Sequence, residues 1–177
     1  MSPNRSLEQV EDVDSDGLVR RTIPRWQMRE ENALHRSVYI AVVCVVGSQV
    51  CLVVHRRSTT KDVNPGLWDV AFGGVCGVGE SPGQAARREL EEEAGIGGVE
   101  LTSLGTGLYE DSKNRVLGTV FLARYQGELI FVDGEVIDSR RVRVEQIDDW
   151  VSSTPVCLDS VSLVLPRVRA YLDSAAI

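Results

Sequence analysis

The sequence lacks several features that would place the chain in whole classes of protein. Its four cysteines form no C-x-x-C pair, and no nearby histidine completes a zinc pattern. Three of them lie in apolar stretches, so we expect reduced, buried thiols in a cytoplasmic protein, because disulfides are rare in that compartment. No apolar run reaches about 18 residues, so no membrane span is expected. The acidic first residues have no apolar core, so we expect no signal peptide.

An excess of positive charge is also missing. The chain has 26 acidic and 19 basic residues, which gives a net charge of -7. Proteins that bind DNA or RNA usually carry a basic stripe, so we expect no nucleic acid polymer as a partner. A small phosphorylated substrate remains compatible with this charge, because a local basic pocket can attract it.

The pattern of apolar and turn-forming residues predicts helices interspersed with a strand-rich middle, so the fold class is α/β or α+β. Strands are expected at 37–46, 50–55, 68–75, 99–109, 116–125 and 141–144, and helices at 82–94, 144–151 and 160–172. We interpret residues 1–32 as an N-terminal extension that holds a hairpin and a short helix, and residues 33–177 as the main domain. The extension either lies against that domain or serves as a dimer arm, and the residues leave both open.

The most informative stretch runs from Gly73 to Ile96. It opens with glycines and continues as a helix, for which Ser81 is a good N-cap, Gln84 completes a capping box and Gly95 is placed to end the helix. The helix carries four glutamates in five positions: Glu89, Glu91, Glu92 and Glu93. Each like-charged i,i+4 pair costs roughly 0.2–0.5 kcal/mol, and a divalent cation would offset that cost.

Helical geometry separates these glutamates into two sets. Glu89, Glu92 and Glu93 fall within an arc of roughly 100°, whereas Glu91 points away. Three carboxylates on one edge can bind a hard cation through oxygen. The plainer interpretation is an acidic helix face exposed to water, which is the usual reading of a run of glutamates.

The spacing in this stretch resembles the Nudix box. Gly74 is followed after five residues by Glu80 and after seven more by Arg88-Glu89-Leu90-x-Glu92-Glu93-x-Gly95-Ile96. The resemblance implies an α/β fold, namely an α/β/α sandwich with a mixed central sheet. It also implies Mg²⁺- or Mn²⁺-dependent hydrolysis of a nucleoside diphosphate linked to another group.

Residue roles follow from the resemblance by position. The metal would be bound by the carboxylates of Glu89, Glu92 and Glu93 and by a backbone carbonyl of Gly73. Glu80 and Arg88 would shape the turn between loop and helix, with Gly74 and Gly95 as structural glycines of the box. Members of this family often form dimers, so a homodimer is an open expectation that no residue here decides.

Two further sets of candidates lie outside the box. For the general base, the resemblance allows a glutamate of the box or a carboxylate from a later loop, and we single out Glu135, with Glu145 behind it. Arg56, Arg57 and Lys61 are candidates for contacts with substrate phosphates. For all five residues the competing interpretation is an ordinary exposed charge.

A narrower resemblance links the chain to the isopentenyl-diphosphate-isomerase-like branch of the family. It rests on Leu34-His35-Arg36, on His55 to Ser58 and on Lys61 to Trp68. True isomerases of that branch have a cysteine before the first box glycine and a histidine after it, where this chain has Gly73 and Val75. Hydrolysis is therefore preferred, with isomerisation and non-catalytic sensing of a nucleotide ligand as the alternatives.

Overall fold

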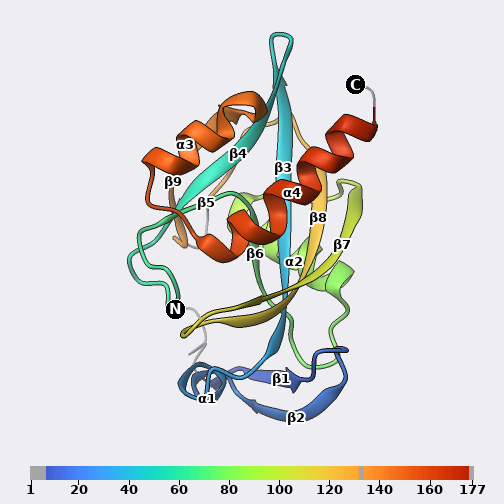
Figure 1. Ribbon diagram of the computed structural model, residues 1–177, viewed down its shortest axis with the longest axis vertical. Coiled ribbons are helices and arrows are strands. Elements are labelled where there is room, and N and C mark those ends of the chain that lie inside the picture. The colour runs from blue at the N-terminus through green and yellow to red at the C-terminus, as the bar shows by residue number, and fades with distance from the viewer. Residues whose placement is uncertain (1–6, 132–133, 176–177) are drawn as a thin grey trace.

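The computed structural model describes residues 7–131 and 134–175, and the long strand β3 runs through its centre (Figure 1). The strands are β1 (Gln9–Val13), β2 (Val19–Pro24), β3 (His35–Val46), β4 (Gln49–Arg57), β5 (Trp68–Asp69), β6 (Phe72–Val75), β7 (Leu101–Glu110), β8 (Arg115–Arg124) and β9 (Val136–Arg143). The helices are α1 (Arg25–Glu30), α2 (Pro82–Ala94), α3 (Ile147–Ser153) and α4 (Leu158–Ser174), and a 3₁₀ turn spans Val144–Gln146.

Strand β3 organises a mixed sheet. It pairs in parallel with β8 along most of its length, and antiparallel with β4, β6 and, at one position, β1. β7 extends the sheet beyond β8, and β9 extends it beyond β4. A strand with neighbours on both sides and helices on both faces has to be apolar throughout. The run of β-branched residues at 37–46 satisfies that demand.

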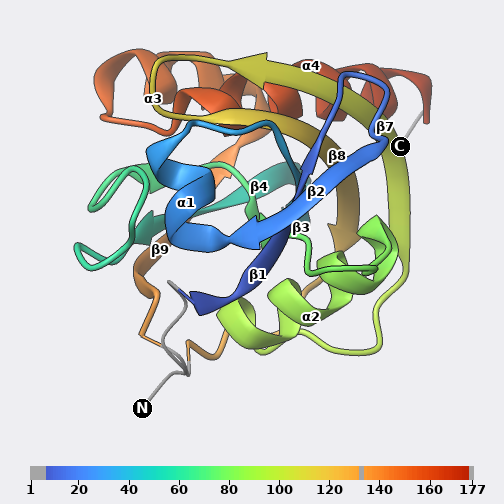
Figure 2. The same cartoon turned by 90° about the horizontal axis from the view of Figure 1, so that it is seen from below.

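The side chains of β3 divide the core into two parts. Tyr39, Ala41 and Val43 face one cluster, into which α3 and α4 pack. Ile40 and Val42 face the other, into which α2 packs its alanines and Leu90. Figure 2 shows the result as three layers, with α3 and α4 on one side of the sheet and α2 on the other. The α/β/α sandwich with a mixed central sheet is therefore confirmed.

The first described residues form a hairpin and a short helix beside this sandwich. β1 and β2 pair around the turn at residues 14–17, and α1 follows directly. A small separate cluster, made by Val10, Ile23, Met28, Ala33 and Val75, joins them to β6. The division of the chain at residue 32 into an extension and a domain stays a prediction.

Most expected elements differ from the observed ones only by a few residues at their ends, and two expected strands differ more. The single strand expected at 68–75 is wrong, because β5 and β6 are separate. Asp69 Oδ1 accepts a hydrogen bond from the Ala71 backbone N–H at 3.2 Å, and this local turn interrupts the ladder. The strand expected at 141–144 corresponds to the last three residues of the longer β9, which begins at Val136, and Val144 already belongs to the 3₁₀ turn.

Other expectations concern cysteines and the membrane. All four cysteines are free and buried. Among the described residues, no helix combines the length and the apolar character needed to cross a membrane.

Candidate active site

Helix α2 begins and ends where its sequence predicts. The Ser81 hydroxyl accepts a hydrogen bond from the Gln84 backbone N–H at 3.3 Å, and the Gln84 side chain accepts one from the Ser81 N–H at 3.0 Å. Gly95 ends the helix in the left-handed conformation, with φ of 66°. These two ends fix the length of the helix, and the apolar face made by Ala86, Leu90 and Ala94, which packs into the core, decides which glutamates face the sheet.

Glycines of β6 allow α2 to approach closely. Gly73 has φ of 153°, and a Cβ atom there would overlap the backbone of Val38. A Cβ atom on Gly74 would overlap the carboxylate of Glu89. The Gly73 N–H also donates to Glu93 Oε2 at 3.0 Å. The glycines therefore leave room for two helix carboxylates at the surface of the strand.

Glu89 and Glu93 form a buried acidic pair on α2. Their exposed fractions are 5% and 1%. Burial, together with the charge of Glu93, raises the pKa of Glu89 to about 7, although Arg88 acts in the opposite direction. Glu93 Oε1 lies 2.8 Å from the Lys61 ammonium. Each carboxylate of the pair thus has one cationic partner, which is Lys61 for Glu93 and Arg88 for Glu89.

Arg88 ties the box residues together. Its Nε and Nη2 donate to the two oxygens of Glu80, each at 2.9 Å, and Nη1 donates to Glu89 at 2.6 Å. This geometry lowers the pKa of Glu80, chiefly through the hydrogen bonds from Arg88. The role of Glu80 and Arg88 in shaping the turn between loop and helix stays a prediction.

Glu92 stands apart from the buried pair. Its side chain is 44% exposed, and its closest described ion pair is with Arg88 Nη1 at 3.4 Å. Within residues 7–131 and 134–175, no group of three or more His, Cys, Asp or Glu side chains is arranged to hold a metal ion. Metal binding by Glu89, Glu92, Glu93 and the Gly73 carbonyl therefore stays a prediction.

Lys61 connects the box to the later candidate for the base. Its ammonium contacts both Glu93 and Glu135, and the Glu135 side chain is only 15% exposed. Glu145, the second candidate, is exposed on the 3₁₀ turn after β9. Of the two, the structure brings Glu135 to the acidic pair.

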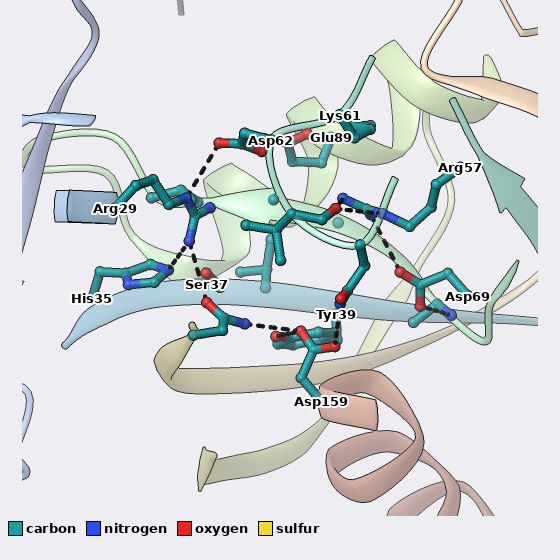
Figure 3. Close-up of a pocket in the computed structure, with 18 of the residues that line it drawn as sticks. Arg29, His35, Ser37, Tyr39, Arg57, Lys61, Asp62, Asp69, Glu89 and Asp159 are labelled. Carbon is teal, nitrogen blue, oxygen red and sulfur yellow. Dashed lines mark hydrogen bonds and ion pairs between the residues drawn. The ribbon is translucent and has the colours of Figure 1, made fainter. Parts of the chain in front are cut away.

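A pocket opens beside these residues, between α1, β3, β6 and the loop after β4 (Figure 3). Glu89, Gly73 and Gly74 line it, and so do Lys61 and Arg57. Two of the three predicted phosphate ligands, Arg57 and Lys61, are therefore at the pocket. The third, Arg56, is exposed, and its Nε donates to the Gly66 carbonyl at 3.1 Å.

The floor of the pocket holds a second acidic group that the sequence reading missed. Asp159, at the start of α4, accepts hydrogen bonds from the Tyr39 hydroxyl at 2.8 Å and from the Asn114 amide at 3.2 Å (Figure 3). Burial and the nearby Asp69 raise the pKa of Asp159. Arg57 Nη1 forms an ion pair with Asp69 at 3.3 Å. Burial alone would lower the pKa of Arg57, but Asp69 and other acidic neighbours raise it above its usual value.

The pocket also has a basic wall that the sequence reading missed. Arg25 and Arg29 lie one turn apart on α1, and both line the pocket together with Asp62. The i,i+4 spacing of the two arginines was visible in the sequence. Nothing local indicated that α1 would lie against the loop after β4.

Cys76 bears on isomerase chemistry. It is 3% exposed, and burial raises the pKa of its thiol to about 12. A thiol with such a pKa is almost entirely protonated near neutral pH, so it is a poor nucleophile or acid–base group. This fits a structural cysteine.

Comparisons with known proteins agree on one family. The sequence model of the NUDIX domain matches residues 33–158. A protein of Pseudomonas aeruginosa described as an uncharacterized Nudix hydrolase is 34% identical over 162 residues, which are 92% of this chain and 92% of that protein.

Two solved structures have a similar fold. A crystal structure from Deinococcus radiodurans has a TM-score of 0.68 at 21% identity and covers 84% of this chain and 92% of its own. The NUDIX domain of Shewanella oneidensis NrtR, solved with ADP ribose, has a TM-score of 0.65 at 19% identity and covers 79% of this chain and 89% of its own.

Proposed function

Since this chain belongs to the Nudix family and is a hydrolase, we propose that it cleaves the diphosphate linkage of a nucleoside diphosphate joined to another group, with Mg²⁺ or Mn²⁺ as cofactor. The observation that carries this proposal is the buried pair of Glu89 and Glu93 under the glycines of β6. Two carboxylates at that depth, with the pKa of one raised to about 7, favour a site that gains positive charge when it works.

The donor set suits a hard divalent cation. Oxygen ligands are what Mg²⁺ and Mn²⁺ prefer, and the clearance at Gly74 leaves the Glu89 carboxylate room at the strand. Glu89, Glu92, Glu93 and the Gly73 carbonyl would hold the ion, for which Glu92 has to leave its contact with Arg88. Bound there, the ion supplies neutralisation of the diphosphate and a lower pKa for the attacking water.

The chain's own side chains would bind and orient the substrate. Arg57 and Lys61 line the pocket with positive charges, which suit the phosphates of the substrate. Arg88 holds Glu89 in place through its 2.6 Å contact. For the proton of the attacking water, Glu135 is our candidate, because Lys61 links it to Glu93.

Isomerisation is disfavoured by the residues that stand where an isomerase has its cysteine and its histidine. Gly73 and Val75 supply neither a thiol nor an imidazole, and Cys76 is buried with a raised pKa. Formation of an allylic diphosphate by the purified protein would support it. Non-catalytic sensing is disfavoured by the complete box.

A substrate panel with matched variants tests the proposal. The panel contains nucleotide sugars including ADP ribose, dinucleoside polyphosphates, nucleoside triphosphates and coenzyme A, each assayed for phosphate-bearing products with Mg²⁺ and with Mn²⁺. On the best substrate, Glu93→Gln should lower kcat by at least about 100-fold, because a charged ligand is lost. Glu91→Gln is the control, since Glu91 is exposed on the same helix. Full activity of Glu93→Gln with Mg²⁺ would falsify the site assignment.

The expected cytoplasmic location and the homodimer remain separate predictions. Neither affects the chemistry proposed above. The mass of the purified protein in solution would decide the second.

A further inference from the structure

Helix α1 contributes two partly buried guanidinium groups to the pocket. The side chains of Arg25 and Arg29 are 13% and 20% exposed. Both line the same pocket as Glu89 and the glycines of β6. The first described residues are therefore part of the wall of the proposed active site.

These two arginines share one carboxylate within the pocket. Asp62 Oδ2 lies 3.3 Å from Arg25 Nε and 3.2 Å from Arg29 Nε. Arg25 has a further ion pair with Glu8 at 3.2 Å, which lies outside the pocket lining. The remaining described polar contacts of Arg29 are the Asn114 side chain at 3.2 Å and the ring of His35 at 3.5 Å.

The partners of Arg29 leave its charge incompletely balanced. Burial and the charge of Arg29 lower the pKa of His35 to about 3, so His35 is neutral and brings no negative charge. The pKa of Arg29 is itself lowered, chiefly by burial and also by the neighbouring Arg25. Within the pocket the two guanidinium groups share the single carboxylate of Asp62, while Glu8 pairs with Arg25 outside the pocket lining. A phosphate group, which has more than one charged oxygen, can contact both arginines at once.

Asp62 is the most readily displaced member of this group. Its side chain is 41% exposed, and it belongs to the loop between β4 and β5. Figure 3 shows Asp62 above Arg29, at the opposite side from His35. A carboxylate on an exposed loop can move away without breaking the sheet, whereas the arginines are fixed on α1.

We propose that Arg25 and Arg29 form an anion subsite for a phosphate group of the ligand, and that Asp62 occupies this subsite until the phosphate displaces it. The proposal rests on the proposed function in one respect, because the phosphate belongs to the same substrate. It adds Arg25 and Arg29 as phosphate-binding residues from outside the box, and Asp62 as a carboxylate of the same chain that competes with the phosphate. A phosphate has the negative charge and the pairs of oxygens that the planar guanidinium groups of two arginines bind well.

Pyrophosphate binding in a buffer with EDTA tests the subsite without the metal. Calorimetry on the full chain should show that exchanging Arg25 and Arg29 together for Gln weakens pyrophosphate binding by about 10- to 100-fold, because two charged hydrogen-bond donors are lost. Asp62→Asn should strengthen it by roughly tenfold, since the competing carboxylate is neutralised. Arg20→Gln and Asp16→Asn, which each change one charge on an exposed residue of the same segment, are the controls, and both should leave binding unchanged.

Three results would overturn the subsite. One is a wild-type melting temperature that millimolar pyrophosphate does not raise in EDTA, because a bound ligand stabilises the folded protein. Another is unchanged affinity in Asp62→Asn, a variant that removes no buried group. The third is equal weakening by Arg20→Gln, which would indicate unspecific charge attraction. None depends on hydrolysis, so failure of the proposed function would be seen separately in the substrate panel.

Discussion

His35 makes the stability of the protein depend on pH. It is 1% exposed, and burial together with Arg29 lowers its pKa from an ordinary 6.5 to about 3. Between these values the unfolded chain binds a proton that the folded protein does not, so stability falls as the pH falls. We expect a loss of about 2 kcal/mol from this residue between pH 7 and pH 5. Urea unfolding at the two pH values measures it.

The matched variants are His35→Gln and His55→Gln. His55 is also 1% exposed with a lowered pKa, and these are the two histidines of the chain. Each variant should be less sensitive to acid than the wild type in this range, and the double variant least sensitive. An unchanged difference between pH 7 and pH 5 in His35→Gln would contradict the prediction.

Single residues were predictable from the sequence only where the helix period decides their direction. Glu91 points away from the site and Glu93 faces the sheet, as the period indicates. The period did not indicate that Glu92 would be exposed beside Arg88 while Glu89 was buried. That difference depends on how closely β6 approaches, which no pattern within α2 encodes.

At the scale of elements, the fit of α2 against β6 depends on Gly74. A Cβ atom there would overlap the Glu89 carboxylate, so Gly74→Ala should push that carboxylate from its position. We expect kcat to fall by about 100-fold, because a displacement near 1 Å is costly for catalysis. Steady-state kinetics on the best substrate of the panel measures it.

Gly77→Ala is the control for this change. A Cβ atom on Gly77 would meet Glu80 at 3.4 Å, which is ordinary contact, and Gly77 is not among the glycines with positive φ. Its activity should stay within about threefold of the wild type. Equal losses in the two variants would show that any added methyl disturbs the loop, and Gly74 would then have no special role.

Elements with strong local signals were predicted well. The cap at Ser81 and the glycine at 95 bound α2, and the apolar run at 37–46 lies within β3. The break between β5 and β6 was missed because it depends on one side-chain hydrogen bond of Asp69. The strands that pair with β3 also could not be predicted from the sequence, because a strand that is buried on both faces is compatible with many neighbours.

At the scale of the whole molecule, the pocket joins segments that are far apart in the chain. Arg29 comes from α1, Asp62 from the loop after β4, and Glu89 from α2. The sequence predicted the chemistry of the box because its residues are close together. It could not predict the basic wall, because the packing of α1 depends on a small apolar cluster whose five residues come from five separate segments.

That cluster provides a test of how the first residues contribute to binding. Met28 is 1% exposed in it and lies on α1 between the two arginines. Met28→Ala should lower the free energy of unfolding by about 2–5 kcal/mol. It should also weaken pyrophosphate binding in EDTA several-fold, because Arg25 and Arg29 lose their fixed position.

Leu52→Ala separates this local effect from general loosening. Leu52 is also 1% exposed, but it lies on β4 in the cluster beneath α3 and α4. It should cost a similar 2–5 kcal/mol in urea unfolding and leave pyrophosphate affinity near that of the wild type. If both variants weaken binding equally, the pocket responds to overall stability, and the fixed position of α1 does not control the anion subsite. If only Met28→Ala weakens it, the docking of α1 sets the affinity for phosphate.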